Sequence, residues 1–468
     1  MKRKPLVAAY YFPNWHCDPR VEDLHGKGWT EWRVAQYATP RFPGHQQPKV
    51  PLWGYQDESE PDVMAQKISA AKAYGVNAFI WDWYWFSDGP YRHRALEEGF
   101  LKAPNCEDIK FAIMWANHNP IYAHPGSYWK PAEINWSGAV NPETFRDCTD
   151  YCIKNFLGRP NYLRLSDGSL YFMLYRLGAL VEEVGGLDTA AALIREFRDK
   201  VEKAGLGKLH ISTVFEALPD VWRALESPEH DFTGINHFIE TLTVDSITSY
   251  GWGYKDDFPA TDYAKWAKNN HYIPLVFNKH LKCAFNPNVL TGWDSSPRTV
   301  QSDMFENRNY PFGPVVVNNT PERFQEELQF AKNILDSDES RGQMIKISCW
   351  NEWTEGTYLE PDTENGYAAV PESIGKLYYA DGSEQFNKVY QTYGNYSMAF
   401  AGAVKDGSAM LIDWTDPDTA LNVHHSRIDS PYAGGSDQLS FSLSMTQHSG
   451  AFQMRVLGKA GYVQIAKA

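Results

Sequence analysis

Residues 61–86 read PDVMAQKISAAKAYGVNAFIWDWYWF and contain the pattern on which the fold prediction rests. In residues 61–74 apolar side chains recur with the period of a helix. Residues 77–85 form a continuous apolar and aromatic run, typical of a strand buried on both faces. The stretch therefore predicts a helix followed at once by a strand, the repeating unit of a parallel sheet.

The same alternation recurs up to about residue 355. Strands are expected at residues 6–12, 77–85, 110–116, 169–175, 210–215, 234–238, 272–278 and 344–350, and helices at 61–74, 141–156, 188–204, 261–270 and 320–335. Eight strands alternating with helices predict an α/β fold, a (β/α)₈ TIM barrel. An open doubly wound sheet is the alternative, although the glycine fingerprint of dinucleotide-binding folds does not follow the first strand.

Three long segments leave the carboxyl ends of the expected strands: residues 13–60, 117–140 and 279–314. Barrel enzymes build their active sites at this end, and loops of such length are usually functional. We therefore expect residues 1–400 to form a catalytic barrel. Residues 401–468, where Gly pairs separate short alternating runs, are expected to form a small β-rich C-terminal unit, either a carbohydrate-binding module or a lid.

Composition excludes several classes of protein. The formal charge of −14 disfavours nucleic acid or an anionic membrane as a partner. No apolar run approaches the roughly 18 residues of a membrane span. With no signal peptide visible, the chain is expected to be cytoplasmic, or periplasmic or secreted if a leader was removed. The 15% aromatic content suits both sugar rings and a protein core.

The sequence predicts neither a metal nor a cofactor. Six cysteines in 468 residues do not form a disulfide framework. Cys148 and Cys152 have the spacing of one helix face, but no second Cys or His pair completes a zinc site, so buried free thiols are expected. No Gly-x-Ser-x-Gly elbow accompanies a strand, which disfavours a serine nucleophile.

The eighth expected strand runs into a pair of glutamates in MIKISCWNEWTEGTYLEP, residues 344–361. Because side chains alternate along a strand, the even-numbered positions are predicted to face the barrel interior. That set is Lys346, Ser348, Trp350 and Glu352, with Ile345, Ile347 and Cys349 facing the helices. Glu355 follows three residues later, before Gly356, where a turn would bring its carboxyl back over the same cavity.

Two carboxylates at a barrel mouth are what glycoside cleavage requires. One must hold a proton for the departing oxygen, and the other must stay ionised near the anomeric carbon. Apolar walls of Trp350 and Trp353 would raise one pKa while hydrogen bonds lower the other. The alternative is that Glu352 and Glu355 are capping or salt-bridge residues on a solvated loop.

At this point the sequence resembles a known family. NEWTEGTYLEP looks like the signature of the glycoside hydrolase family 99 clan, the endo-α-mannosidase clan, and especially of its WbsX-like branch, often found in bacterial polysaccharide loci. Further landmarks follow in the same order over residues 6–370: Tyr10-Tyr11-Phe12-Pro13, Gly28-Trp29-Thr30-Glu31-Trp32, Gly44-His45-Gln46-Gln47-Pro48, Trp83-Tyr84-Trp85-Phe86, Trp115-Ala116-Asn117 and Gly292-Trp293-Asp294 with Pro297-Arg298. One departure is His118, where the branch commonly has an acidic residue.

The resemblance implies a (β/α)₈ barrel that cleaves or remodels glycans, classically endo-acting on α-mannosides with retention. Glu352 would remove the proton of the sugar's own 2-hydroxyl, which attacks the anomeric carbon to give a 1,2-anhydro sugar. Glu355 would protonate the leaving group and then activate water. The expected partner is an oligosaccharide or polysaccharide. The expected substrate-binding residues are Tyr11, Trp29, Glu31, Asp82, Tyr84, Trp115, Asn117, His118, His237, Trp293, Asp294, Asn351 and Trp353.

Each of these expected substrate-binding residues could instead serve only to stabilise the fold. Trp29 and Glu31 could line a subsite or fix their own loop. Asp82 is costly to bury alone, so it either binds a sugar hydroxyl or pairs with an Arg. His237, at the end of the sixth expected strand, is a rim residue or a core histidine. The expected partner of Arg298 is Asp294.

Two other functions remain open. A glycosyltransferase of polysaccharide assembly would need to bind a sugar nucleotide, and no phosphate-binding glycine loop or basic cluster is visible. A non-catalytic glycan-binding barrel would not need two facing acids.

Overall fold

The computed structural model describes residues 5–366, with gaps at 120–123, 128, 130–135, 254–256 and 309, and short strands between 402 and 467. The chain divides into two compact units, Met1–Tyr378 and Tyr379–Ala468. In the part of the chain that is described, no helix is long and apolar enough to cross a membrane.

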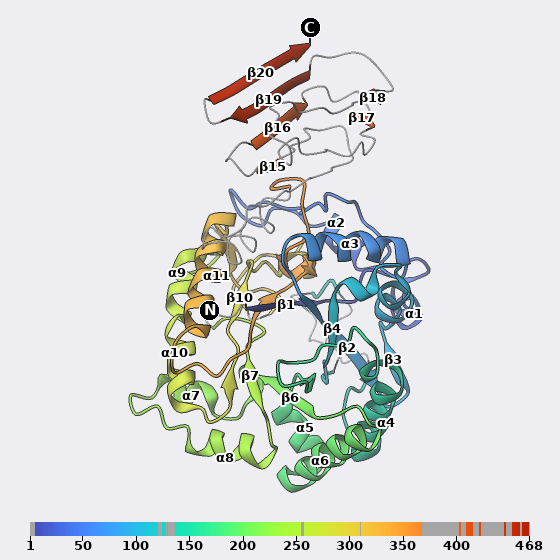
Figure 1. Ribbon diagram of the computed structural model, residues 1–468, viewed down its shortest axis with the longest axis vertical. Coiled ribbons are helices and arrows are strands. Elements are labelled where there is room, and N and C mark those ends of the chain that lie inside the picture. The colour runs from blue at the N-terminus through green and yellow to red at the C-terminus, as the bar shows by residue number, and fades with distance from the viewer. Residues whose placement is uncertain are drawn as a thin grey trace, which may run out of the picture. The chain divides into compact units, whose positions relative to one another are not determined.

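The first unit is built on a closed parallel sheet (Figure 1). Its strands, in chain order, are β1 (Leu6–Tyr11), β2 (Ala78–Phe86), β4 (Lys110–Trp115), β5 (Leu170–Leu174), β6 (Leu209–Val214), β7 (Ser246–Thr248), β9 (Ala284–Phe285), β10 (Asn288–Leu290) and β12 (Met344–Ser348). Each pairs in parallel with its neighbour, and β1 pairs with both β2 and β12.

The barrel closes through an interrupted strand. β9 pairs with β7, β10 pairs with β12, and only Asn286 and Pro287 separate the two halves. Since β9 and β10 act as one strand, the barrel has eight, and the predicted (β/α)₈ fold is confirmed.

Helices surround the strands because each βα unit buries one helix face on the sheet (Figure 1). They are α1 (Pro19–His25), α2 (Trp32–Gln36), α3 (Pro61–Ala73), α4 (Pro142–Cys152), α5 (Leu177–Glu183), α6 (Leu187–Lys203), α7 (Val221–Glu226), α8 (Thr233–Thr241), α9 (Tyr263–Asn270), α10 (Tyr272–His280) and α11 (Pro321–Leu335). Several begin with a side-chain cap followed by Pro: Asn141 accepts from the Thr144 N–H, and Thr320 from the Arg323 N–H. The predicted helices at α3, α4, α6, α9 and α11 are confirmed.

Short elements complete this unit. The strands are β3 (Gly89–Tyr91), β8 (Ala260–Asp262), β11 (Val315–Val317), β13 (Asn351–Glu352) and β14 (Thr357–Tyr358). Single turns of 3₁₀ or π helix lie at Ala95–Gly99, Phe100–Lys102, Cys106–Asp108, Ile153–Leu157, Phe215–Ala217, Ser296–Arg298 and Trp353–Glu355.

Six of the eight predicted strands are confirmed, and the sixth and seventh are wrong. Residues 234–238 and 272–278 lie in the helices α8 and α10. A short apolar run does not distinguish a buried helix turn from a buried strand. The true strands β7, β9 and β10 escape detection because they have two or three residues each, and β7 and β10 also carry Ser, Thr or Asn.

The predicted long segments leave the carboxyl ends of strands. Residues 13–60 follow β1 and contain α1 and α2. The third segment begins at Thr291, after β10, and not at Lys279, which lies within α10.

The second unit contains an antiparallel sheet of β15 (Gly402–Ala403), β16 (Ala409–Trp414), β19 (Phe452–Gly458) and β20 (Gly461–Lys467), and a pair formed by β17 (Leu421–Asn422) and β18 (Ser444–Met445). The predicted boundary at residue 400 lies outside the described residues and stays a prediction.

Candidate active site

A cavity of about 430 Å³ opens at the carboxyl ends of the barrel strands, within the range of small-ligand sites. Seven predicted residues line it: Glu31, Asp82, Tyr84, His118, Trp293, Glu352 and Glu355. They come from β2 and from the segments after β1, β4, β10 and β12. The closed barrel thus brings together side chains more than 300 residues apart in sequence.

Glu352 is buried at this cavity, with 3% of its surface exposed. Its Oε1 accepts from Arg298 Nη2 at 3.1 Å, and its Oε2 accepts from the Tyr250 hydroxyl at 2.5 Å. Both oxygens of this carboxyl group therefore have donors, and one donor is the cationic guanidinium of Arg298.

Glu355 lies in the turn of 3₁₀ helix that follows Glu352, and Gly356 with φ 64° then reverses the chain. Glu355 accepts from Arg298 Nη1. Burial and the neighbouring charge of Glu352 raise the pKa of Glu355 to about 8. Two carboxyls of one cavity thus differ in environment, and Glu355 holds its proton at neutral pH.

Arg298 connects the two glutamates to the first loop. Its Nε donates to Glu31 Oε1 at 3.1 Å and to Thr354 Oγ1 at 2.9 Å, and Nη1 donates to Tyr310 at 2.6 Å. Burial opposes ionisation of Glu31, but the nearby cations, Arg298 first, outweigh it and lower the pKa of Glu31. The planar guanidinium fixes three carboxylates in one arrangement.

The expected pairing of Asp294 with Arg298 is wrong. Asp294 Oδ2 accepts from His45 at 2.8 Å and from Gln47 at 2.6 Å, and Oδ1 accepts from the Ser296 N–H. Asp294 lines a separate hollow and fixes the loop, since its oxygens already have these donors.

Asp82 and Tyr84 share the face of β2 that borders the cavity. Asp82 Oδ2 lies 2.9 Å from the Tyr250 hydroxyl oxygen. The ring of Tyr84 meets His118 edge to face, with 5.8 Å between centroids. Burial lowers the pKa of His118, and its Nδ1 lies 3.0 Å from the Asn119 carbonyl oxygen, to which it donates.

Several predicted residues lie outside the cavity because they fix the backbone. Asn117 donates to the Arg176 carbonyl at 3.0 Å and accepts from its N–H at 2.8 Å. Asn351 does the same for Phe12, with both distances at 2.8 Å, and also donates to Glu58. Their amides join neighbouring strand ends, which positions the residues beside them.

Four predicted aromatic residues are also core components. Tyr11 faces the helices, stacks on Trp81 at 4.1 Å and donates to Met64. Trp115 is fully buried, and Trp29 stacks on His25 in its own loop at 4.3 Å. Trp353 stacks on Tyr358 at 3.8 Å and donates to Glu360.

Two further placements differ from the prediction. His237 is exposed on α8, because the strand expected there is a helix.

The prediction that the Trp350 side chain faces the barrel interior is also wrong. β12 ends at Ser348, alternation stops there, and Trp350 packs on Phe79 at 5.3 Å, while Cys349 contacts Tyr250 and Glu352. Burial and Glu352 thus replace the expected tryptophan walls as the cause of the raised Glu355 pKa.

Several residues that line the cavity were not predicted from the sequence. Phe12, Arg92, Tyr175, Arg176, Tyr250 and Tyr310 also border the cavity. Tyr250 follows β7, so correct placement of that strand would have pointed to it. Arg176 directly follows the predicted fourth strand and carried the same positional signal as Asn117.

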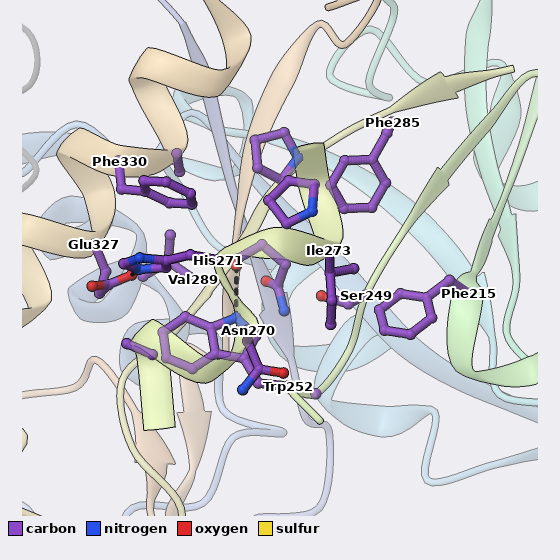
Figure 2. Close-up of a pocket in the computed structure, with 16 residues that line it drawn as sticks. Phe215, Ser249, Trp252, Asn270, His271, Ile273, Phe285, Val289, Glu327 and Phe330 are labelled. Atoms are coloured by element: carbon purple, nitrogen blue, oxygen red, sulfur yellow. Dashed lines mark hydrogen bonds and ion pairs between the residues drawn. The ribbon is translucent and has the colours of Figure 1, made fainter. Parts of the chain in front are cut away.

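A second, smaller cavity of about 40 Å³ lies among α9, α10, α11 and the ends of β7 and β9 (Figure 2). His271 there pairs with Glu327 at 2.8 Å and stacks on Phe330 at 4.0 Å. The volume of this cavity is enough for about two or three waters and too small for a sugar. Among the described residues, no group of three His, Cys, Asp or Glu side chains could hold a metal ion.

The family model described as Glycosyltransferase WbsX matches residues 7–372, most of the chain. The chain belongs to the WbsX family. The membership predicted from the motifs is therefore confirmed, and it covers the whole barrel.

Two curated relatives come from Xanthomonas campestris pv. campestris, the uncharacterized proteins named WxcX of strains B100 and ATCC 33913. Each is 28% identical over 370 residues, which covers 77% of this chain and 48% of the relative. The chain thus spans about half the length of these relatives. Among solved structures, a GH99 endo-alpha-mannosidase from Bacteroides thetaiotaomicron is similar with TM-score 0.49 and 15% identity, covering 80% of this chain and 96% of that one. A family 1 β-glucosidase from Thermotoga maritima is similar with TM-score 0.43 and 8% identity, covering 82% of this chain and 99% of that one.

Proposed function

We propose that this chain is a retaining glycoside hydrolase that cleaves a glycan with Glu352 and Glu355. The observation that carries the proposal is the pair of buried carboxyls on one cavity, one hydrogen-bonded to Arg298 and Tyr250, the other with a pKa of about 8. A base and an acid are therefore both ready at neutral pH.

The reaction follows the roles that the family resemblance implies. Glu352 takes the proton of the 2-hydroxyl, whose oxygen bonds to the anomeric carbon as the bond to the leaving oxygen breaks. Glu355 gives its proton to that leaving oxygen. Water then attacks the anomeric carbon as the bond from that carbon to the 2-oxygen breaks. Glu355 takes the proton of the water, and Glu352 returns a proton to the 2-oxygen, so that both residues recover their initial states.

The cavity walls supply contacts for a sugar. Trp293 and Tyr84 present aromatic surface suited to the apolar face of a ring. His118 and Glu31 offer hydrogen-bonding groups at the same cavity. The resemblance makes endo-cleavage of α-mannosides the first reaction to test.

The test is a screen of α-mannans and other polysaccharides with product analysis, on wild type, Glu355→Gln and Glu352→Gln. We expect cleavage by wild type and losses of about 10²–10⁴-fold in kcat for each variant, the usual contribution of a positioned acid or base. Glu355→Gln should recover most with an activated aryl leaving group, which needs no proton. Normal rates in both variants would exclude the two-carboxylate mechanism.

The description of the family model favours a second candidate, glycosyl transfer. That reaction needs a bound sugar nucleotide, and Arg92, Arg176 and Arg298 at the cavity could meet its phosphates. Calorimetry with nucleotide sugars separates the two functions. Saturable binding together with formation of a new glycosidic bond would replace the hydrolase proposal, whereas hydrolysis without nucleotide binding supports it.

A further inference from the structure

Asp82, Tyr250 and Glu352 form a chain of hydrogen bonds with a fixed number of protons. The Tyr250 hydroxyl lies 2.9 Å from Asp82 Oδ2 and 2.5 Å from Glu352 Oε2. A phenol has one proton and donates to only one carboxyl. The second contact is a hydrogen bond only if that carboxyl carries a proton of its own and donates it to the phenol oxygen.

The surroundings decide which carboxyl holds this extra proton. Glu352 is paired with a cation, since the Arg298 guanidinium donates to the other Glu352 oxygen, Oε1, at 3.1 Å. Asp82 is 3% exposed, its Oδ1 has no hydrogen-bond partner, and no Lys, Arg or His among the described residues forms an ion pair with it. An ionised carboxylate buried without a cation is very costly, so the proton belongs on Asp82.

The other titratable groups near Asp82 favour the same state. Glu352 and Glu355 are acids, and the negative charge that either carries when ionised opposes ionisation of Asp82. The remaining neighbours, Tyr10, Tyr84, Tyr175, Tyr250 and Cys349, stay neutral, since burial raises the pKa of each. Burial first and Glu352 second raise the pKa of Asp82 well above its ordinary value.

We propose that Asp82 is a protonated positioning residue: its O–H donates to Tyr250, and Tyr250 donates to Glu352. Every donor in this chain of hydrogen bonds then points toward Glu352. This arrangement keeps the negative charge on the Glu352 oxygen that acts as the base. The inference rests on the proposed role of Glu352, and it names a residue that acts on that base through a tyrosine.

The hydrogen-bond chain is testable without any substrate. At pH 7 the infrared difference between wild type and Asp82→Asn should contain the C=O band of one protonated carboxyl. In Tyr250→Phe this band should shift to higher wavenumber, because the proton loses its acceptor. Loss of the band in Glu352→Gln and its persistence in Asp82→Asn would overturn the assignment, because the proton would then lie on Glu352.

Kinetics give the second readout. Asp82→Asn keeps a donor toward Tyr250, whereas the similarly sized Asp82→Leu does not. We expect kcat to fall less than about tenfold in Asp82→Asn and about 10²-fold or more in Asp82→Leu, with KM changed less than kcat, the split expected when a transition-state interaction is lost. Equal losses in the two variants would overturn the proposal. If wild type cleaves no glycan, the proposed function fails, while the infrared result still decides the protonation of Asp82.

Discussion

Arg298 shows how one side chain can set the chemistry of several others. It contacts Glu31, Glu352 and Glu355 through different nitrogens, and its guanidinium lies 5.2 Å over the Phe12 ring. Without it, the carboxyl groups of three glutamates would be buried near one another with little compensation. A lysine has a single ammonium and cannot reproduce this planar geometry.

We therefore expect Arg298→Lys to fold but to lose about 10²-fold in kcat/KM, which corresponds to about 2.7 kcal/mol of transition-state stabilisation. Glycan cleavage rates, with circular dichroism to verify folding, measure this. The matched control is Arg323→Lys, whose ion pair with Asp262 is about one third exposed and should matter little. Equal activity of wild type and Arg298→Lys would contradict the role given to the guanidinium.

The raised pKa of Glu355 also predicts a cost in stability. Its folded pKa of about 8 lies above the ordinary 4.5, so the native state binds a proton that the unfolded chain releases. The stabilising effect of this bound proton is fully present below pH 4.5 and is lost as pH rises toward 8, so the folded protein becomes less stable over this range.

Glutamine at this position does not titrate, so Glu355→Gln should unfold at a higher temperature than wild type, by a margin that grows from pH 4.5 to 8. Melting curves across this range test the sign. Glu229→Gln is the control, since Ser227 lowers the pKa of that exposed carboxylate and no gain is expected. A lower melting temperature for Glu355→Gln at pH 7 would contradict the prediction.

At the scale of elements, the junction after β12 determines where both glutamates lie. Asn351 satisfies the backbone N–H and C=O of Phe12, and its own carbonyl accepts from Trp15 at 2.9 Å. β13 then pairs with β14; Glu352 is the last residue of β13, and Glu355 lies in the turn that connects the two strands. The end of β1 is thereby joined to the hairpin.

Asn351→Ala should lower the free energy of unfolding by about 3 kcal/mol, because each buried polar group left unsatisfied costs about 1–3 kcal/mol. Activity should fall as well, since Glu352 is the next residue. Urea unfolding measures the first effect. Asn333→Ala, on the exposed face of α11, removes a hydrogen bond to Gln329 and should change stability by less than about 0.5 kcal/mol. Similar losses in the two variants would contradict the structural role of Asn351.

At the scale of the whole molecule, the barrel has its own closed sheet and core within Met1–Tyr378. We expect a chain that ends at residue 378 to fold and to keep its melting temperature within a few degrees, since the barrel buries its own core. Circular dichroism and thermal unfolding of the full and shortened chains test this, together with glycan cleavage. Aggregation of the shortened chain would show that the barrel depends on the second unit.

The sequence by itself determined the fold class and the two glutamates. Long apolar runs such as β1, β2 and β12 alternate with periodic helices, and this local pattern needs no tertiary information. A carboxylate placed after the last such strand necessarily lies at the barrel mouth.

Only the tertiary structure decided which other side chains meet those glutamates. Arg298 and Tyr250 reach them from different loops, and no spacing along the chain encodes a contact of that kind. The same holds for Asn117 and Asn351, whose positions suggested sugar binding but whose amides satisfy neighbouring backbone groups. Local periodicity reports which face of an element is buried, whereas ion pairs and hydrogen bonds depend on how distant loops converge once the barrel closes.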